Sequence, residues 1–126
     1  MQASVRISSA TPEADLDAAI QPGIATIYYP RVESARQVQA ADEQITRLEK
    51  LRGMRPLTVA IRPLIESPQG VCCAREIAAR SPRVHAFGLG PNVDLAGEAR
   101  AYAQAECELV ARVLGLVPLD LHYSFD

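Results

Sequence analysis

The sequence predicts an α/β fold in which about five parallel strands alternate with four helices. Short apolar runs alternate with segments that carry helix-capping residues along all 126 residues. This alternation is typical of parallel strands joined by helices. Because 48% of the residues are hydrophobic and the length lies within the usual range for one domain, we expect a single domain over residues 1–126.

The beginning of the chain predicts a strand, a helix and a second strand. An apolar run over residues 3–8 forms the first strand. Thr11 then provides an N-cap, and Pro12 suits the first helical position, where no N–H partner is needed. This helix is expected to run to about residue 20. The β-branched and aromatic run Ile24–Tyr29 stops before a proline and predicts the second strand.

The longest helix of the first half is expected to follow Ser34 and to end near Leu51. Ser34 and Gln37 have the spacing of a capping box, and Gly53 marks the end of the helix. Apolar residues recur at steps of three and four on one helical face, as an amphipathic helix requires. They are Val38, Ala41, Ile45 and Leu48.

The middle of the chain predicts another strand, helix and strand. The third strand is expected over residues 57–65, with Arg62 and Pro63 favouring a bulge or an early strand end. A cap residue followed by a proline then predicts one helix over residues 67–79. An apolar run over residues 84–89 predicts the fourth strand.

The last helix and strand are expected over residues 96–114 and 117–123. Gly115 ends the helix, which has apolar residues at helical spacing. They are Tyr102, Ala105, Leu109 and Val113.

Composition and charge exclude several classes of function. The formal net charge is −2, so the basic surface that nucleic-acid binding requires is absent. No stretch reaches the roughly 18 apolar residues of a membrane span, and the N-terminus does not resemble a leader peptide. We therefore expect a cytoplasmic protein with neither a nucleic-acid nor a membrane partner. Cys72, Cys73 and Cys107 lack the spacing of a zinc or redox site and are interpreted as buried apolar residues.

The polar residues at the strand ends are the candidates for chemistry. Right-handed crossovers place the loops that follow parallel strands on one common face. The polar residues there are Arg6, Arg31, Glu33, Glu66, Asn92, Asp94, Asp120 and Asp126.

Five ordered motifs around these positions carry a family resemblance. They read VRI at residues 5–7, YPRVES at 29–34, LIESPQGV at 64–71, SPRVHAFG at 81–88 and GLVPLD at 115–120. Their order and spacing resemble the citrate lyase beta-subunit-like, or HpcH/HpaI aldolase, family, whose strand ends read PKVES and IETxxG. The family usually has an aspartate three residues after a Phe-Gly pair, whereas Asp94 comes six residues after Gly88.

The resemblance implies a β/α barrel that cleaves or forms a carbon–carbon bond next to a carbonyl, usually on coenzyme A thioesters such as citryl-CoA or malyl-CoA. It also implies Mg²⁺ as cofactor, with Glu66 and Asp94 as metal ligands and Arg6 as a catalytic and substrate-binding residue. A hard cation would stabilise the enolate oxygen, and an arginine fork suits a substrate carboxylate. Asn92 is an alternative, neutral occupant of the second ligand position.

Other polar residues have plainer interpretations. Arg31 stands where many members of this family have lysine, and with Glu33 it is expected to form a salt bridge at the barrel rim. His85 and His122 lie in predicted strands and are interpreted as ordinary strand residues. The spacing of Asp120 and Asp126 assigns them no role.

The five strands would make an incomplete (β/α) barrel, since a closed barrel of this kind has eight strands. Such a piece exposes strand edges, so we expect a homo-oligomer or docking on a related subunit. Two functions remain open from the sequence. One is an active lyase. The other is a catalytically inactive, truncated member of the family that acts only as an interaction or assembly partner.

Overall fold

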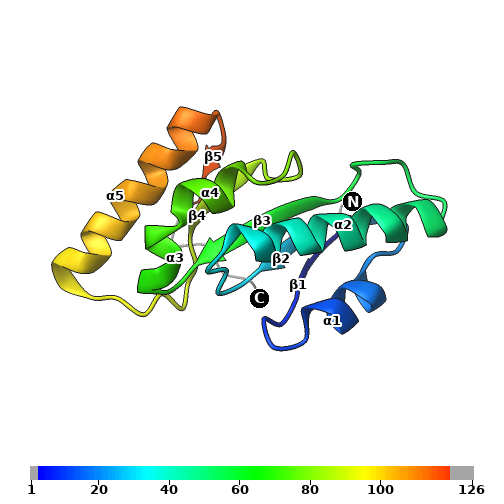
Figure 1. The fold of residues 1–126 in the computed structure, drawn as a ribbon, viewed down its shortest axis with the longest axis horizontal. Coiled ribbons are helices and arrows are strands. Elements are labelled where there is room, and N and C mark those ends of the chain that lie inside the picture. The colour runs from blue at the N-terminus through cyan, green and yellow to red at the C-terminus, as the bar shows by residue number, and fades with distance from the viewer. Residues whose placement is uncertain (1–2, 120–126) are drawn as a thin grey trace.

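The computed structural model describes residues 3–119 and contains one parallel sheet (Figure 1). The five strands lie side by side in sequence order, β1-β2-β3-β4-β5, and each pairs in parallel with the next. The predicted α/β fold with five parallel strands is therefore confirmed. Its sequential strand order is that of a barrel segment.

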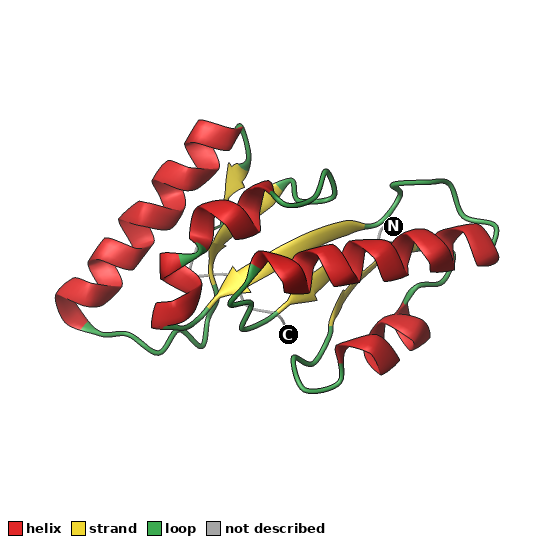
Figure 2. Ribbon diagram, in the orientation of Figure 1, coloured by secondary structure: helices red, strands yellow, loops and turns green. Residues whose placement is uncertain are grey.

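Helices connect the strands and cover one face of the sheet, the face toward the viewer in Figure 2. The elements are β1 (Ala3–Arg6), α1 (Pro12–Ala19), β2 (Ile24–Tyr29), α2 (Ala35–Leu51), β3 (Ala60–Ile65), α3 (Pro68–Cys72), α4 (Ala74–Ala79), β4 (Ala86–Leu89), α5 (Gly97–Leu114) and β5 (Val117–Pro118).

Alternate residues of the strands point to opposite faces of this sheet. On the helix-covered face, Ile27 and Ile61 are buried in the hydrophobic core. Arg6, Tyr28 and Arg62 form a row across the other face, because Arg6 pairs with Tyr28 and Tyr28 with Arg62 in the sheet register. The Arg62 Nη1 donates to the Tyr28 hydroxyl at 2.7 Å. β3 thus continues through Arg62 without the bulge or early end that its sequence favoured.

α2 follows its prediction closely. The Gln37 side-chain Oε1 accepts hydrogen bonds from the backbone N–H of Ser34 at 3.0 Å and of Glu33 at 2.7 Å. The predicted apolar face is buried and packs on the sheet. Local capping and periodicity therefore suffice to define this helix.

Two predicted helices differ from the structure. The segment expected as one helix over residues 67–79 is split at Cys73 into α3 and α4. In α5, Tyr102, Leu109 and Val113 are exposed, so the predicted apolar stripe does not face the core. The buried residues of α5 are Ala103, Cys107, Val110 and Ala111. Small side chains on this face allow the helix to approach β4 and α4 closely.

Several smaller expectations are also corrected. β4 begins at Ala86, so His85 precedes the strand and is exposed, with its Nε2 3.1 Å from the Pro82 carbonyl oxygen. Of the three cysteines only Cys107 is buried, whereas Cys72 is exposed. The end of the predicted fifth strand, together with Asp120, His122 and Asp126, lies outside the described residues.

A buried ionic network ties α2 to the segment that enters β4. Arg83, only 1% exposed, donates from Nη2 to Glu49 Oε1 at 2.7 Å and from Nη1 to Glu49 Oε2 at 2.9 Å. Its Nε donates to Asp42 at 2.6 Å. Burial opposes the charge of Glu49, but Arg83 and the N–H groups of Val59 and Leu57 hold the pKa of Glu49 below its ordinary value.

Between residues 3 and 119, the helices are too short or too polar to cross a lipid bilayer.

Candidate functional site

A pocket of about 470 Å³ lies at the carboxyl ends of β1, β2 and β3. β1 and the loop after it contribute Arg6 and Ser8, the loop after β2 contributes Arg31, and Glu66 follows β3 directly. The carboxyl ends of parallel strands share one edge of a sheet, which brings these distant positions together. In β/α barrels this is the face where active sites lie. The structure thus places two residues predicted to act together, Arg6 and Glu66, in one pocket.

Glu66 is fully buried, yet it is one of the residues that line the pocket. Its Oε1 accepts a hydrogen bond from the backbone N–H of Arg31 at 2.9 Å, and its Oε2 accepts one from the backbone N–H of Asn92 at 2.9 Å. Each carboxylate oxygen has about two lone-pair directions. One direction on each oxygen therefore remains for a further partner, and two main-chain donors hold the group in place without neutralising its charge.

Arg6 lines the same pocket from the end of β1. It is an exposed residue at the end of β1, on the sheet face that the helices leave uncovered. A guanidinium presents a planar set of donors that matches a carboxylate in two-point contact. A pocket lined by Arg6 and Glu66 can therefore receive both an anionic group and a cation.

The loop after β4 supplies the second predicted ligand position. Asn92 lines the pocket, and its main chain binds Glu66. Asp94 is exposed and is not among the described residues that line this pocket. Its backbone N–H donates to the backbone carbonyl of Glu66 at 2.8 Å, so the chain at Asp94 runs directly beside Glu66.

The expected salt bridge between Arg31 and Glu33 is not formed. Among the ion pairs of residues 3–119 there is none between these two side chains. Glu33 Oε2 instead accepts a hydrogen bond from the Ser67 hydroxyl at 2.6 Å, and Ser67 caps α3 by accepting from the N–H of Gly70. The loops after β2 and β3 are joined in this way, next to Glu66.

Asp15 lines the pocket as well and was missed from the sequence. Its Oδ2 accepts from the backbone N–H of Ser8 at 2.7 Å, and its Oδ1 accepts from the Thr11 hydroxyl at 3.2 Å. Asp15 sits in the first turn of α1, where an acid is explained by the helix dipole alone. Only its spacing from Thr11 could have indicated that it folds back toward the end of β1.

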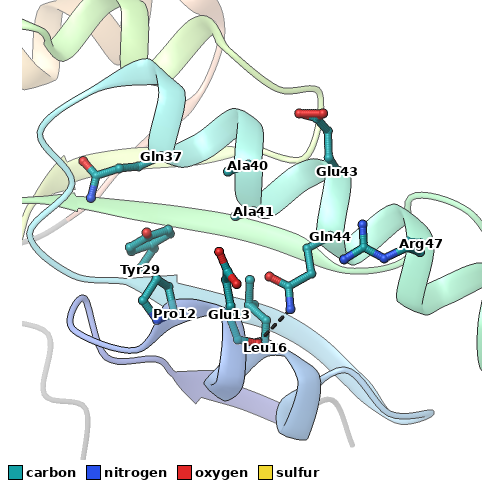
Figure 3. Close-up of a pocket in the computed structure, with 10 residues that line it drawn as sticks. All are labelled: Pro12, Glu13, Leu16, Tyr29, Gln37, Ala40, Ala41, Glu43, Gln44 and Arg47. Carbon is teal, nitrogen blue, oxygen red and sulfur yellow. Dashed lines mark hydrogen bonds between the residues drawn. The ribbon is translucent and has the colours of Figure 1, made fainter.

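A second pocket, of about 340 Å³, lies between α1 and α2 on the helix-covered side of the sheet (Figure 3). The Glu13 carboxylate points into the space between the two helices, and Gln44 Nε2 donates to the Glu13 backbone carbonyl at 2.7 Å. Tyr29 lines this pocket, and burial raises its pKa although a hydrogen bond with Gln37 acts in the opposite direction. Among residues 3–119, this pocket shares no lining residue with the one around Glu66.

The residues around Glu66 fit a hard divalent cation. Mg²⁺ prefers oxygen ligands and is commonly held by one or two carboxylates, with water and substrate oxygens in its other positions. The pocket offers the Glu66 carboxylate with free lone pairs, the Asp15 carboxylate and the Asn92 side chain. Across the described part of the chain, three or more His, Cys, Asp or Glu side chains do not gather around one point as in an all-protein metal cage.

Known proteins match large parts of this chain. Citrate lyase subunit beta of Escherichia coli K12 is 29% identical over 119 residues, which cover 87% of this chain and 39% of that protein. Malyl-CoA/beta-methylmalyl-CoA/citramalyl-CoA lyase of Chloroflexus aurantiacus is 35% identical over 83 residues, covering 66% of this chain and 23% of that protein. L-malyl-CoA/beta-methylmalyl-CoA lyase of Cereibacter sphaeroides (strain ATCC 17025) is 41% identical over 64 residues.

The chain spans less than half the length of these relatives. The model of the family described as HpcH/HpaI aldolase/citrate lyase matches residues 1–114, which is most of the chain. This match agrees with the parallel sheet and with a pocket at the carboxyl ends of its strands. The chain belongs to the HpcH/HpaI aldolase/citrate lyase family.

Proposed function

We propose that this chain carries the metal- and substrate-binding strand ends of a Mg²⁺-dependent carbon–carbon lyase that acts on a CoA thioester of a hydroxy acid. One observation carries the proposal. The fully buried Glu66 carboxylate is held by two main-chain N–H groups and keeps unused lone pairs, and Glu66 lines a pocket that Arg6 also lines.

The substrate class is proposed from the relatives. Their names describe lyases of malyl-CoA, beta-methylmalyl-CoA and citramalyl-CoA and a subunit of citrate lyase. Cleavage of such a thioester yields an acyl-CoA and an oxo acid, and negative charge develops on the thioester oxygen as the carbon–carbon bond breaks. A cation bound at Glu66 would supply electrostatic stabilisation of that oxygen.

Residues of the chain itself are proposed to bind the cation and the substrate. Glu66 holds the cation through oxygens whose orientation its two N–H donors fix. We propose Asp94 as the second metal ligand, since its main chain is hydrogen-bonded to that of Glu66, with Asn92 as the alternative. Arg6 binds a carboxylate or developing oxyanion of the substrate through its planar fork.

A second candidate is an assembly partner without activity. In the described sheet, β1 and β5 are edge strands, and the face that carries Arg6, Tyr28 and Arg62 has no helix over it. Edges of this kind pair readily with another chain. A second copy of this chain or a related subunit would serve, and the printed name of the E. coli relative describes it as a subunit.

Mg²⁺ binding tests the enzymatic proposal most directly. Calorimetric titration of the chain with Mg²⁺ is expected to show binding that Glu66→Gln weakens at least about tenfold, because the substitution removes the charge of a ligand but little of its volume. Glu108→Gln is the matched control, since Glu108 is a half-exposed acid on α5. Equal Mg²⁺ affinity in the wild type and Glu66→Gln would remove Glu66 from the metal site.

Two further measurements test whether the chain cleaves a thioester and whether it forms an oligomer. Chromatography of CoA products after incubation with malyl-CoA and Mg²⁺ is expected to show cleavage by the wild type and none by Glu66→Gln. Light scattering gives the mass in solution. A chain that neither binds Mg²⁺ nor cleaves the thioester, but forms a stable oligomer, would favour the assembly partner.

A further inference from the structure

One of the two hydrogen bonds to the Glu66 carboxylate comes from a residue with an unusual backbone conformation. Arg31, which donates to Oε1, has a φ of 52°. In the described part of the chain only Arg31 and Leu57 have positive φ without being glycine. Residues with a side chain rarely adopt this conformation, and strained backbone often occurs at functional sites.

The left-handed conformation of Arg31 directs two consecutive N–H groups toward the end of β3. The Arg31 N–H reaches the Glu66 side chain, and the N–H of Val32 donates to the Leu64 backbone carbonyl at 3.2 Å. β2 has ended at Tyr29, so these are not bonds of the strand pair. The turn at Arg31 therefore fastens the chain after β2 to both the side chain and the main chain around Glu66.

On the other side of the carboxylate, Gly90 leaves the space that Glu66 fills. A Cβ atom at position 90 would lie 2.6 Å from the Glu66 Cδ and Cγ and 2.7 Å from its Oε2. The Gly90 N–H donates to the Ile65 carbonyl at 2.9 Å, which fixes the main chain at this distance. Only glycine fits there without displacing the Glu66 carboxylate.

We infer that Arg31, through its left-handed backbone, and Gly90, through its missing side chain, are positioning residues that fix the orientation of the Glu66 carboxylate toward the pocket. The inference rests on the proposed function, in which Glu66 binds Mg²⁺. The inference gives the backbone of Arg31 a role that favours cation binding, whereas the charge of its side chain opposes it. A guanidinium beside a cation site repels the cation, whereas the backbone of the same residue orients the ligand.

Two substitutions separate the backbone of Arg31 from its charge. Arg31→Gly and Arg31→Val both remove the guanidinium. Glycine adopts positive φ freely, whereas a β-branched residue strongly disfavours it. In Arg31→Val the turn is expected to rearrange and the N–H bond to Glu66 to be lost. Arg31→Gly is therefore expected to bind Mg²⁺ about tenfold more tightly than Arg31→Val, as is typical when a group that orients a metal ligand is removed.

The chain provides a matched control in Leu57. It has a φ of 60°, and its N–H donates at 3.2 Å to the carboxylate of another buried acid, Glu49, outside the Glu66 pocket. Leu57→Gly and Leu57→Val impose the same change of backbone preference there. The two Leu57 variants are expected to have equal Mg²⁺ affinity.

Gly90→Ala provides a second route if Arg31→Val does not fold. Its methyl group would push the Glu66 side chain aside, so the variant is expected to bind Mg²⁺ about tenfold more weakly than wild type. A double-mutant cycle checks that the clash is with Glu66 itself. In urea unfolding, Gly90→Ala is expected to destabilise the wild type more than it destabilises Glu66→Ala, in which the space is open.

A measurement without metal separates this inference from the proposed function. In NMR spectra of the metal-free chain, the amide proton of residue 31 is expected to shift on Glu66→Gln in the Arg31→Gly background but not in the Arg31→Val background. If wild type binds no Mg²⁺ while this shift appears, the metal site is wrong and the positioning of Glu66 stands. If no shift appears in the glycine background, or if the wild type binds Mg²⁺ and the two Arg31 variants bind it equally, the inference is overturned.

Discussion

Arg83 and Glu49 form a two-point ion pair in the interior, with each Glu49 oxygen accepting from a different guanidinium nitrogen at 2.7 and 2.9 Å. Both side chains are 1% exposed. Arg83 also donates from Nη1 to the Val59 carbonyl at 2.9 Å, and Glu49 accepts from the Val59 N–H at 3.0 Å. The pair therefore binds both the carbonyl and the N–H group of Val59, just before β3, and holds α2 against the sheet.

Removal of either partner is expected to be strongly destabilising. Arg83→Met would leave the Glu49 carboxylate buried without its counter-ion, which typically costs about 3–5 kcal/mol of unfolding free energy. The control is Arg112→Met, because Arg112 and Glu108 form an exposed pair on α5 that is worth roughly 0.3–0.5 kcal/mol. Urea unfolding followed by circular dichroism measures both variants. If the two variants lose a similar amount of unfolding free energy, the buried pair contributes no more to stability than the exposed one.

The same pair predicts how stability depends on pH. The pKa of Glu49 is lowered from its ordinary value of 4.5, mainly by Arg83 working against burial. Between the folded and the unfolded pKa the unfolded chain binds more protons, so stability falls as the pH falls below about 4.5. Above that value the contribution is fully present.

Glu49→Gln tests this pH dependence. The variant is expected to be less stable than wild type at pH 7, and to lose less stability than wild type between pH 5 and pH 3, because it lacks the titrating group. Urea midpoints measured across this range supply the comparison. Parallel pH profiles for the two proteins would contradict the assignment to Glu49.

The three cysteines are expected to differ in reactivity. Burial, with the nearby charge of Glu106, raises the pKa of the Cys107 thiol to about 12, so almost no thiolate is present at pH 8. Cys72 is exposed and Cys73 partly so. Brief alkylation with iodoacetamide at pH 8, followed by peptide mass spectrometry, should label Cys72 and leave Cys107 unmodified until urea is added. Rapid labelling of Cys107 in the folded chain would show that the inner face of α5 opens readily.

Sequence patterns predicted what depends on local interactions. The bounds of β2 and α2 follow from a proline stop, a capping box and one apolar face, all within the segment itself. Glu66 became a candidate because a polar residue directly after an apolar strand stands out and because the segment around it resembles the family's IETxxG motif. The sequence could not show which N–H groups hold it, since Arg31 and Asn92 are 35 and 26 residues away.

The errors arise where tertiary packing overrides a local rule. α5 has two possible apolar faces, and the one with the larger side chains is exposed because the small residues Ala103 and Ala111 pack against the sheet. No local pattern indicates that Arg83 is buried, because a charged residue is almost never fully buried unless it is paired. Its partner Glu49 is 34 residues away in sequence.

Arg6 provides the last prediction, which tests how the pocket recognises an anion. Arg6→Lys keeps the positive charge at the end of β1 but loses the planar pair of donors that matches a carboxylate. A hydrogen bond between charged groups is worth about 1.5–3 kcal/mol, so loss of one of two is expected to weaken binding of a hydroxy dicarboxylate at least about tenfold. Calorimetry with malate in the presence of Mg²⁺ measures this, with Arg100→Lys on α5 as the control for an exposed arginine remote from β1. Equal malate affinity in Arg6→Lys and wild type would mean that Arg6 acts only as a point charge, and the two-point contact with the substrate would have to be abandoned.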